Sequence, residues 1–140
     1  MSYPGEPALI LIVDDTEPVR ALIARAVAEL GHHVLAASSA EHALEVVAER
    51  GARLDLAILD VHLAGTDGPT LAAVLRRDQP ALRVLLVSGY GDNGERALGD
   101  DPLLAKPFHL DTLARCVEDL LTTGYSKLCP PGVHRRSRPA

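Results

Sequence analysis

Aromatic residues are scarce in this chain, at 3% of 140 residues. The core must therefore be built from aliphatic side chains, and an apolar content of 47% is ample for one folded domain. Long hydrophobic runs are missing as well. None approaches the ~18 residues that a membrane span needs, so we expect no membrane insertion.

Cysteine and positive charge are also in short supply. The two cysteines, Cys116 and Cys129, follow no recognisable secretory signal, so we expect no disulfide framework and a cytoplasmic protein. The formal net charge is −5. Because sequence-independent binding to nucleic acid depends on basic side chains, we expect no direct contact with nucleic acid.

Short apolar segments alternate with helical patterns along most of the chain. The predicted strands are residues 9–13, 33–37, 54–59, 82–87 and 103–105. Helical spacing predicts helices after Thr16, after Ser38 with Glu41 completing a capping box, after Asp67, and over 110–121. This alternation predicts an α/β fold, a doubly wound five-stranded parallel sheet with helices on both faces.

One connection and both ends depart from the alternation. Residues 90–102 are acidic and rich in glycine, which predicts a short or irregular fourth helix. Residues 1–7 are an N-terminal extension and residues 8–122 form the domain. Residues 123–140, with clustered proline and arginine and no apolar periodicity, are predicted to be a disordered tail.

Polar side chains stand at the carboxyl ends of four predicted strands. Asp14 and Asp15 follow the first strand, Asp60 the third, Ser88 the fourth and Lys106 the fifth. Each alone has an ordinary explanation as a turn residue, an amide cap or a solvated charge. One shared site explains all four better, because ligands bind beyond the carboxyl ends of parallel strands.

Three carboxylates and one ammonium group leave a surplus of negative charge at that edge. A hard divalent cation with oxygen ligands would offset it, and we expect Mg²⁺ or Mn²⁺. Such a cation would bind phosphate in the same step. A carboxylate beside a metal, a lysine and a hydroxyl is suited to accept a phosphoryl group by in-line attack.

Four motifs carry a family resemblance. They are Ile10-Leu-Ile-Val-Asp-Asp15, Leu59-Asp60 with Gly65-Thr-Asp-Gly68, Leu86-Val-Ser-Gly-Tyr90, and Leu104-Ala-Lys-Pro-Phe108. In this order and spacing the chain resembles the receiver domain of bacterial two-component response regulators over roughly residues 8–122. The single-domain type and the receivers of hybrid histidine kinases are most similar. The resemblance implies a flavodoxin-like sheet of order 2-1-3-4-5.

The resemblance also implies a role for each acid. Asp60 would be the phosphorylated carboxylate. Asp15 and Asp60 would coordinate Mg²⁺ directly, with the main-chain carbonyl of His62 as a further ligand. Asp14 would act through a metal-bound water.

A switch is implied as well. Lys106, ahead of a cis bond to Pro107, would pair with the phosphoryl group, and Ser88 would hydrogen-bond it and report phosphorylation to the rest of the domain. The aromatic residue that the family places three positions before the lysine is Leu103 here, so Tyr90 is the candidate substitute. We expect the face around the fourth helix to be altered. Any homodimer would therefore form through a different face from the one that the family commonly uses.

As a member of such a family, the chain would take its phosphoryl group from a histidine kinase or a histidine phosphotransfer protein. It would signal by protein–protein contact in a phosphorelay, because only residues 123–140 follow the last predicted helix. It would not be an enzyme beyond catalysing its own phosphorylation and dephosphorylation.

Three other interpretations stay open. The altered switch region also fits a receiver-like binding module that is not phosphorylated. A haloacid-dehalogenase-like phosphohydrolase places a nucleophilic aspartate after its first strand, but its second acid would fall where Thr16 stands. A flavin-binding protein needs a glycine-rich phosphate loop there, and the acidic stretch 14–18 would repel phosphate.

Overall fold

The computed structural model describes residues 6–51, 53–89 and 100–131. Strands and helices alternate along these ranges. The strands are β1 (Leu9–Val13), β2 (His33–Ala37), β3 (Leu56–Asp60), β4 (His62–Leu63), β5 (Thr66–Asp67), β6 (Arg83–Ser88) and β7 (Leu103–Ala105). The helices are α1 (Glu17–Glu29), α2 (Ala40–Arg50), α3 (Gly68–Asp78) and α4 (Leu110–Thr122).

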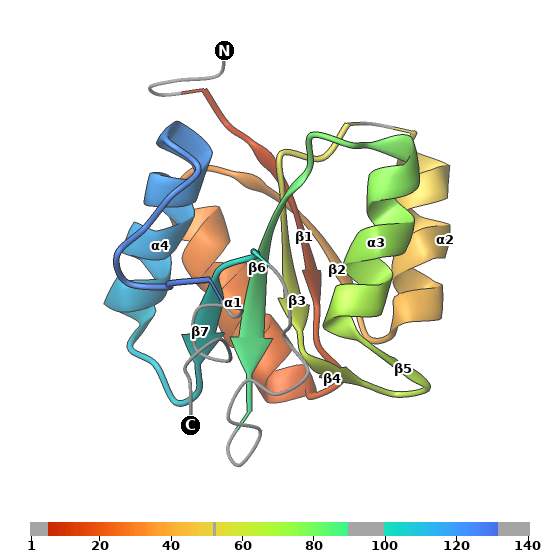
Figure 1. The fold of residues 1–140 in the computed structure, drawn as a ribbon, viewed down its shortest axis with the longest axis horizontal. Helices are drawn as coiled ribbons and strands as arrows, with labels where there is room; N and C mark the ends of the chain where they lie inside the picture. The colour runs from red at the N-terminus through yellow and green to blue at the C-terminus, as the bar shows by residue number, and fades with distance from the viewer. Residues whose placement is uncertain (1–5, 52, 90–99, 132–140) are drawn as a thin grey trace.

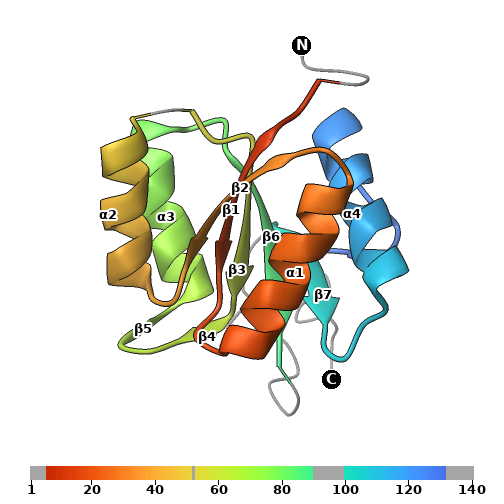
Figure 2. The same ribbon diagram turned by 180° about the vertical axis from the view of Figure 1, so that it is seen from behind.

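The central sheet has the order β2-β1-β3-β6-β7, and all of its strands are parallel. Counting only these five strands, this is the predicted order 2-1-3-4-5. Helices α1 and α4 cover one face of the sheet, and α2 and α3 cover the other (Figures 1 and 2). The predicted doubly wound fold is therefore confirmed. The irregular fourth helix was expected over 90–102, and residues 90–99 lie outside the described residues.

The core is aliphatic, as predicted, and it lies in two layers. Every residue of β1 and β3 is buried, because helices cover both faces of these central strands. Alternate residues point to opposite faces. Leu11 and Leu59 pack in the cluster under α2 and α3, whereas Ile12 and Ile58 pack in the cluster under α1 and α4.

The helices differ in how their N-termini are capped. The N-cap of α2 is Ser39, whose hydroxyl accepts a hydrogen bond from the amide of His42, so the capping box from Ser38 was wrong by one residue. Thr16 occupies the N-cap position of α1, but its side chain does not cap the helix. Asp67 precedes α3, as expected, and its side chain caps the helix by accepting a hydrogen bond from the amide of Thr70.

The prediction of a disordered tail was wrong for residues 123–131, which we call the C-terminal strap. The chain turns at Gly124, where φ is +81°, and packs back against the domain. Ser126 and Cys129 are buried. The amide of Leu103 donates to the carbonyl of Pro130 over 3.0 Å, so the strap adds backbone pairing beside β7. Residues 132–140 lie outside the described residues.

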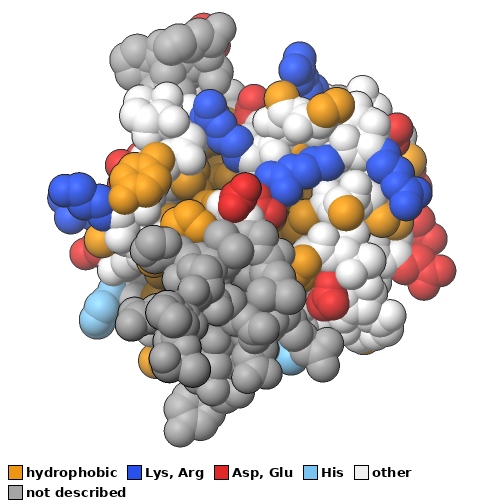
Figure 3. All heavy atoms as spheres, in the orientation of Figure 1, with side chains coloured by type: hydrophobic (Ala, Val, Ile, Leu, Met, Phe, Trp, Pro, Cys, Tyr) orange, Lys and Arg blue, Asp and Glu red, His pale blue; other side chains and the backbone are white. Residues whose placement is uncertain are grey.

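Two observations concern the helices and one face of the described residues. Within the ranges given above, none of the helices has both the length and the apolar character needed to cross a bilayer. On the face drawn in Figure 3, Lys and Arg side chains are spread over the surface, and Asp and Glu side chains lie among them.

Candidate functional site

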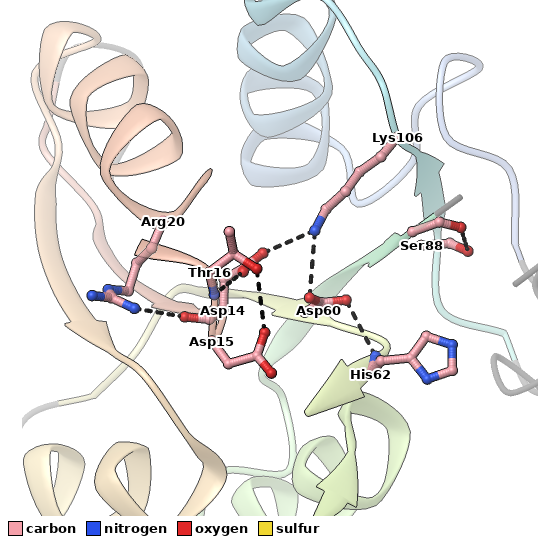
Figure 4. Close-up of polar contacts among 9 residues, drawn as sticks. Asp14, Asp15, Thr16, Arg20, Asp60, His62, Ser88 and Lys106 are labelled. Atoms are coloured by element: carbon pink, nitrogen blue, oxygen red, sulfur yellow. Dashed lines mark hydrogen bonds and ion pairs between the residues drawn. The ribbon is translucent and has the colours of Figure 1, made fainter. Parts of the chain in front are cut away.

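Four strands of the central sheet deliver polar side chains to one edge (Figure 4). Asp14 directly follows β1, Asp60 ends β3, Ser88 ends β6 and Lys106 directly follows β7. The structure therefore brings the predicted residues together. Of the predicted site and switch residues, Tyr90 alone lies outside the described residues.

The three acids form a compact cluster. One carboxylate oxygen from each of Asp14, Asp15 and Asp60 lies within 4.8 Å of the others. The side chains differ in exposure, because Asp14 and Asp60 are only 2% and 6% exposed whereas Asp15 is open to solvent. Oxygen donors that converge in this way suit a hard divalent cation such as Mg²⁺.

Lys106 connects two of these acids. Its Nζ lies 3.1 Å from Oδ2 of Asp14 and 3.4 Å from Oδ2 of Asp60. The lysine amide donates to the carbonyl of Ser88 over 2.8 Å, which extends the β6–β7 pairing by one residue and directs the side chain inward. The peptide bond to Pro107 is cis, as predicted.

The environment raises the pKa of Asp60 above its ordinary value. Burial is the main cause, since it removes water from the charged form. The ammonium of Lys106 acts in the opposite direction, and the negative charge of Asp14 adds to the increase. One lysine therefore does not fully compensate the buried negative charge, and a bound cation would complete the compensation.

The backbone beyond Asp60 holds its carboxylate in place. The amide of His62 donates to Asp60 Oδ1 over 3.2 Å, while the His62 side chain itself is exposed. Gly68, the first residue of α3, packs against the end of β3, and its amide donates to the carbonyl of Val61 over 2.9 Å. A Cβ at this glycine would lie 2.5 Å from the carbonyl oxygen of Asp60, so no larger residue fits without displacement.

Two supports of Asp14 were missed from the sequence. The amide of Thr16 donates to Asp14 Oδ1 over 2.8 Å, and a guanidinium nitrogen of Arg20 donates to the Asp14 main-chain carbonyl over 2.8 Å. The arginine stands one turn into α1, facing the acids that precede the helix (Figure 4). Arg20 follows Asp14 by six positions, and Asp14 precedes the helix, so no helical spacing links the two residues in the sequence.

The predicted switch residues lie on neighbouring strands. Ser88 is buried, and its hydroxyl donates to the carbonyl of Gly89 over 3.4 Å. Leu103 pairs in register with Leu86 and is buried in the cluster under α2 and α3. The aliphatic side chain at this position is thus part of the core.

The sequence matches the model of the response regulator receiver domain over residues 10–118. Sensor kinase CckA of Brucella abortus is 37% identical over 118 residues, which is 81% of this chain and 12% of that protein. Transcriptional regulatory protein TcrA of Mycobacterium tuberculosis is 40% identical over 108 residues, or 74% of this chain and 42% of that protein. The chain thus spans less than half the length of either relative.

Solved structures give the same result at the level of the fold. The receiver domain of the hybrid histidine kinase CckA is 35% identical, with a TM-score of 0.70, and the match covers 81% of this chain and 99% of that one. The receiver domain of NtrX from Brucella abortus is 34% identical, with a TM-score of 0.70, and the match covers 81% and 98%.

Proposed function

Because the chain belongs to the response regulator receiver domain family, we propose that Asp60 accepts a phosphoryl group from a phosphohistidine donor in a Mg²⁺-dependent reaction. The observation that carries this proposal is the position of Lys106 Nζ, which reaches Asp60 and Asp14 at once. A buried carboxylate held beside a fixed ammonium group, next to two further acids, is suited to phosphoryl transfer.

Asp60 would act as the nucleophile. An Asp60 carboxylate oxygen attacks phosphorus while the bond from phosphorus to the donor imidazole nitrogen breaks, and the imidazole leaves and takes up a proton. Lys106 neutralises charge on the transferring oxygens. Asp15, Asp60 and the main-chain carbonyl of His62 would hold Mg²⁺ directly, and Asp14 would hold it through a water. The cation would supply further positive charge at the phosphoryl group.

Ser88 is our candidate reporter of phosphorylation. Its position at the end of β6, beside the strand that leads to Lys106, supports this role. An aspartyl phosphate would add a charge of about −1.5 to −2 if it titrates like other phosphates, which is enough to bias a two-state element. The core position of Leu103 implies that the coupling to a partner runs through another residue, and Tyr90 remains our candidate.

We propose a histidine kinase or a histidine phosphotransfer protein as the donor, in a phosphorelay that signals by protein–protein contact. The similarity to receivers of sensor kinases and transcriptional regulators supports this choice. The chain would catalyse only its own phosphorylation and dephosphorylation. A cytoplasmic location fits its two free cysteines, because stable disulfides are rare in that compartment.

Acetyl phosphate with Mg²⁺, followed by intact mass, tests the proposal. We expect one added phosphoryl group on the native chain, none without Mg²⁺ and none on Asp60→Asn. The matched control is Asp111→Asn, which removes an exposed carboxylate on α4 and should be modified like the native chain.

Absence of an adduct would be followed by beryllofluoride with Mg²⁺, which mimics the acyl phosphate without a chemical step. Shifted amide signals at Ser88 and Lys106 would then support a receiver with a short-lived phosphoryl group. No shift would contradict the proposal and favour the binding module that is not phosphorylated.

A further inference from the structure

The only two cysteines of the chain meet in its interior. Cys116 lies on α4 and Cys129 on the C-terminal strap, and they are 0% and 1% exposed. Both belong to the apolar cluster under α1 and α4, and the thiol of Cys129 is within hydrogen-bonding reach of the Cys116 sulfur. Neither is in a disulfide.

A short turn in the strap brings Cys129 to this position. The hydroxyl of Ser126 donates to Oδ2 of Asp119 on α4 over 2.8 Å, which fixes the turn to the helix. The same hydroxyl accepts from the amide of Leu128 over 3.2 Å, and the Ser126 carbonyl accepts from the amide of Cys129 over 3.3 Å. These hydrogen bonds hold the strap against α4 and so keep Cys129 close to Cys116.

The two thiols are not equivalent. The hydrogen bond from Cys129 lowers the pKa of Cys116, because it stabilises the thiolate. The same bond raises the pKa of Cys129, and burial raises it further. Both shifts apply to the closed strap, in which each sulfur is the main influence on the pKa of the other.

Next to Cys129, the strap pairs with β7. The Pro130 carbonyl accepts from the Leu103 amide, and an antiparallel bridge joins Pro102 and Pro131. Strand β7 has only three residues, pairs with β6 on its other side and leads directly to Lys106. Figure 1 shows the strap running from the end of α4 across to β7. A disulfide between Cys129 and Cys116 would therefore fasten the strap, which pairs with β7, to α4.

We propose that Cys116 and Cys129 form a reversible dithiol–disulfide pair that fastens the C-terminal strap to α4, with a low-molecular-weight disulfide of the glutathione class as the oxidant. Once the strap has opened and one of the two thiols has lost its proton to solvent, that thiolate attacks the small disulfide, so that a mixed disulfide forms and one small thiolate leaves. The other cysteine loses its proton to that leaving group and attacks the protein sulfur of the mixed disulfide, which releases the second small molecule as a thiolate. Two protein thiols are oxidised and one small disulfide is reduced.

Both sulfurs are buried, so the reaction requires the strap to open locally. Its remaining contacts allow this, because the side chains of Tyr125 and Leu128 are exposed and add little apolar burial. Segments with few buried contacts open at a small fraction of the cost of global unfolding.

The test uses the full chain in buffers of reduced and oxidised glutathione, followed by acid quenching, alkylation with N-ethylmaleimide and intact mass. We expect a monomer that is lighter by two hydrogens and carries no maleimide, and that reverts with excess reduced glutathione. Cys129→Ser should stop at the mixed disulfide on Cys116. Glutathione adducts alone on the native chain, disulfide-linked dimers, or thiols that react only after unfolding would each overturn the proposal.

Hydrogen exchange at the Leu103 amide provides the second readout. The fastened strap should protect this amide roughly tenfold or more relative to the reduced chain, because it suppresses local opening. An unchanged exchange rate in the oxidised chain would show that the disulfide does not fasten the strap and would overturn that part of the proposal. The amide of Ile12, in the centre of β1, is the internal control and should exchange equally in both forms.

Discussion

The ammonium group of Lys106 lies 3.4 Å from the carboxylate of Asp60, although the two residues stand at the ends of different strands. Parallel pairing of β3 with β6 and of β6 with β7 creates this proximity. The pairing aligns the carboxyl ends of the strands, so each end contributes one group to the same small volume.

Replacing Lys106 with Gln should slow phosphorylation by acetyl phosphate by about 10²–10³-fold, which is the usual cost of losing one preorganised positive group. The loss of charge, not of fold, is the expected cause, so the far-UV circular dichroism should stay unchanged. Rates come from intact mass against time. The chain has one other lysine, Lys127, which is exposed. Lys127→Gln should react at the native rate, and equal rates for both variants would contradict the assigned role.

Asp60→Asn should make the metal-free protein more stable at neutral pH. Burial raises the pKa of Asp60 in the folded state above its ordinary value of 3.8. The protonated carboxyl group therefore stabilises the fold at a pH below 3.8, and this stabilisation is lost as the pH rises through the folded-state pKa. Urea unfolding in EDTA should therefore show a gain for Asp60→Asn at pH 7 that shrinks toward pH 4.

Mg²⁺ should reverse this order of stability, because it binds the intact acid cluster and raises the free energy of unfolding of the native chain but not of Asp60→Asn. Asp111→Asn should follow the native chain throughout. A variant at Asp60 that is less stable than the native chain at pH 7 without metal would show that the buried charge is already compensated.

Gly68→Ala should destabilise the protein by about 1–3 kcal/mol, the usual cost of forcing an extra carbon into a packed site. The new Cβ would lie 2.5 Å from the carbonyl oxygen of Asp60, which is backbone and cannot rotate away. Gly89→Ala is the matched control, because no atom of the described residues lies within 4 Å of its added Cβ. Urea midpoints that fall equally for the two variants would argue against the close approach.

His32→Ala should cost about 1–3 kcal/mol, the penalty for leaving a buried amide unpaired. The Nδ1 atom of His32 accepts from the amide of Ala8 over 2.9 Å, so Nε2 carries the proton and donates to Glu118 over 2.8 Å. Its exposed neighbour offers the control, and His33→Ala should stay within about 0.5 kcal/mol of the native chain. Similar losses of thermal stability in both would contradict a specific role for the buried ring.

The fold and the centre of the site could be predicted because both depend on patterns that extend over the sequence. Apolar segments at regular spacing predict the strands, and the order of the sheet places Asp14, Asp60 and Lys106 at one edge. The site could be predicted because its function depends on the side chains themselves, which are three carboxylates and one amine.

What could not be predicted depends on main-chain contacts. Arg20 supports Asp14 through a carbonyl oxygen, and Gly68 matters for the side chain that it lacks. The C-terminal strap was missed because its buried residues, Ser126 and Cys129, follow neither helical nor strand periodicity. Its order comes from single hydrogen bonds to α4 and β7, and a sequence pattern does not record these.

The most direct test of the central claim is to identify the phosphorylated residue. Borohydride reduces an acyl phosphate to an alcohol, so it would convert a phosphorylated aspartate to homoserine after treatment with acetyl phosphate and Mg²⁺. The tryptic peptide 54–76 contains Asp55, Asp60 and Asp67, so fragment masses distinguish the acceptor from two internal controls. We predict homoserine at Asp60 alone. Reduction at Asp14, Asp15 or another acid, with Asp60 unchanged, would contradict the account.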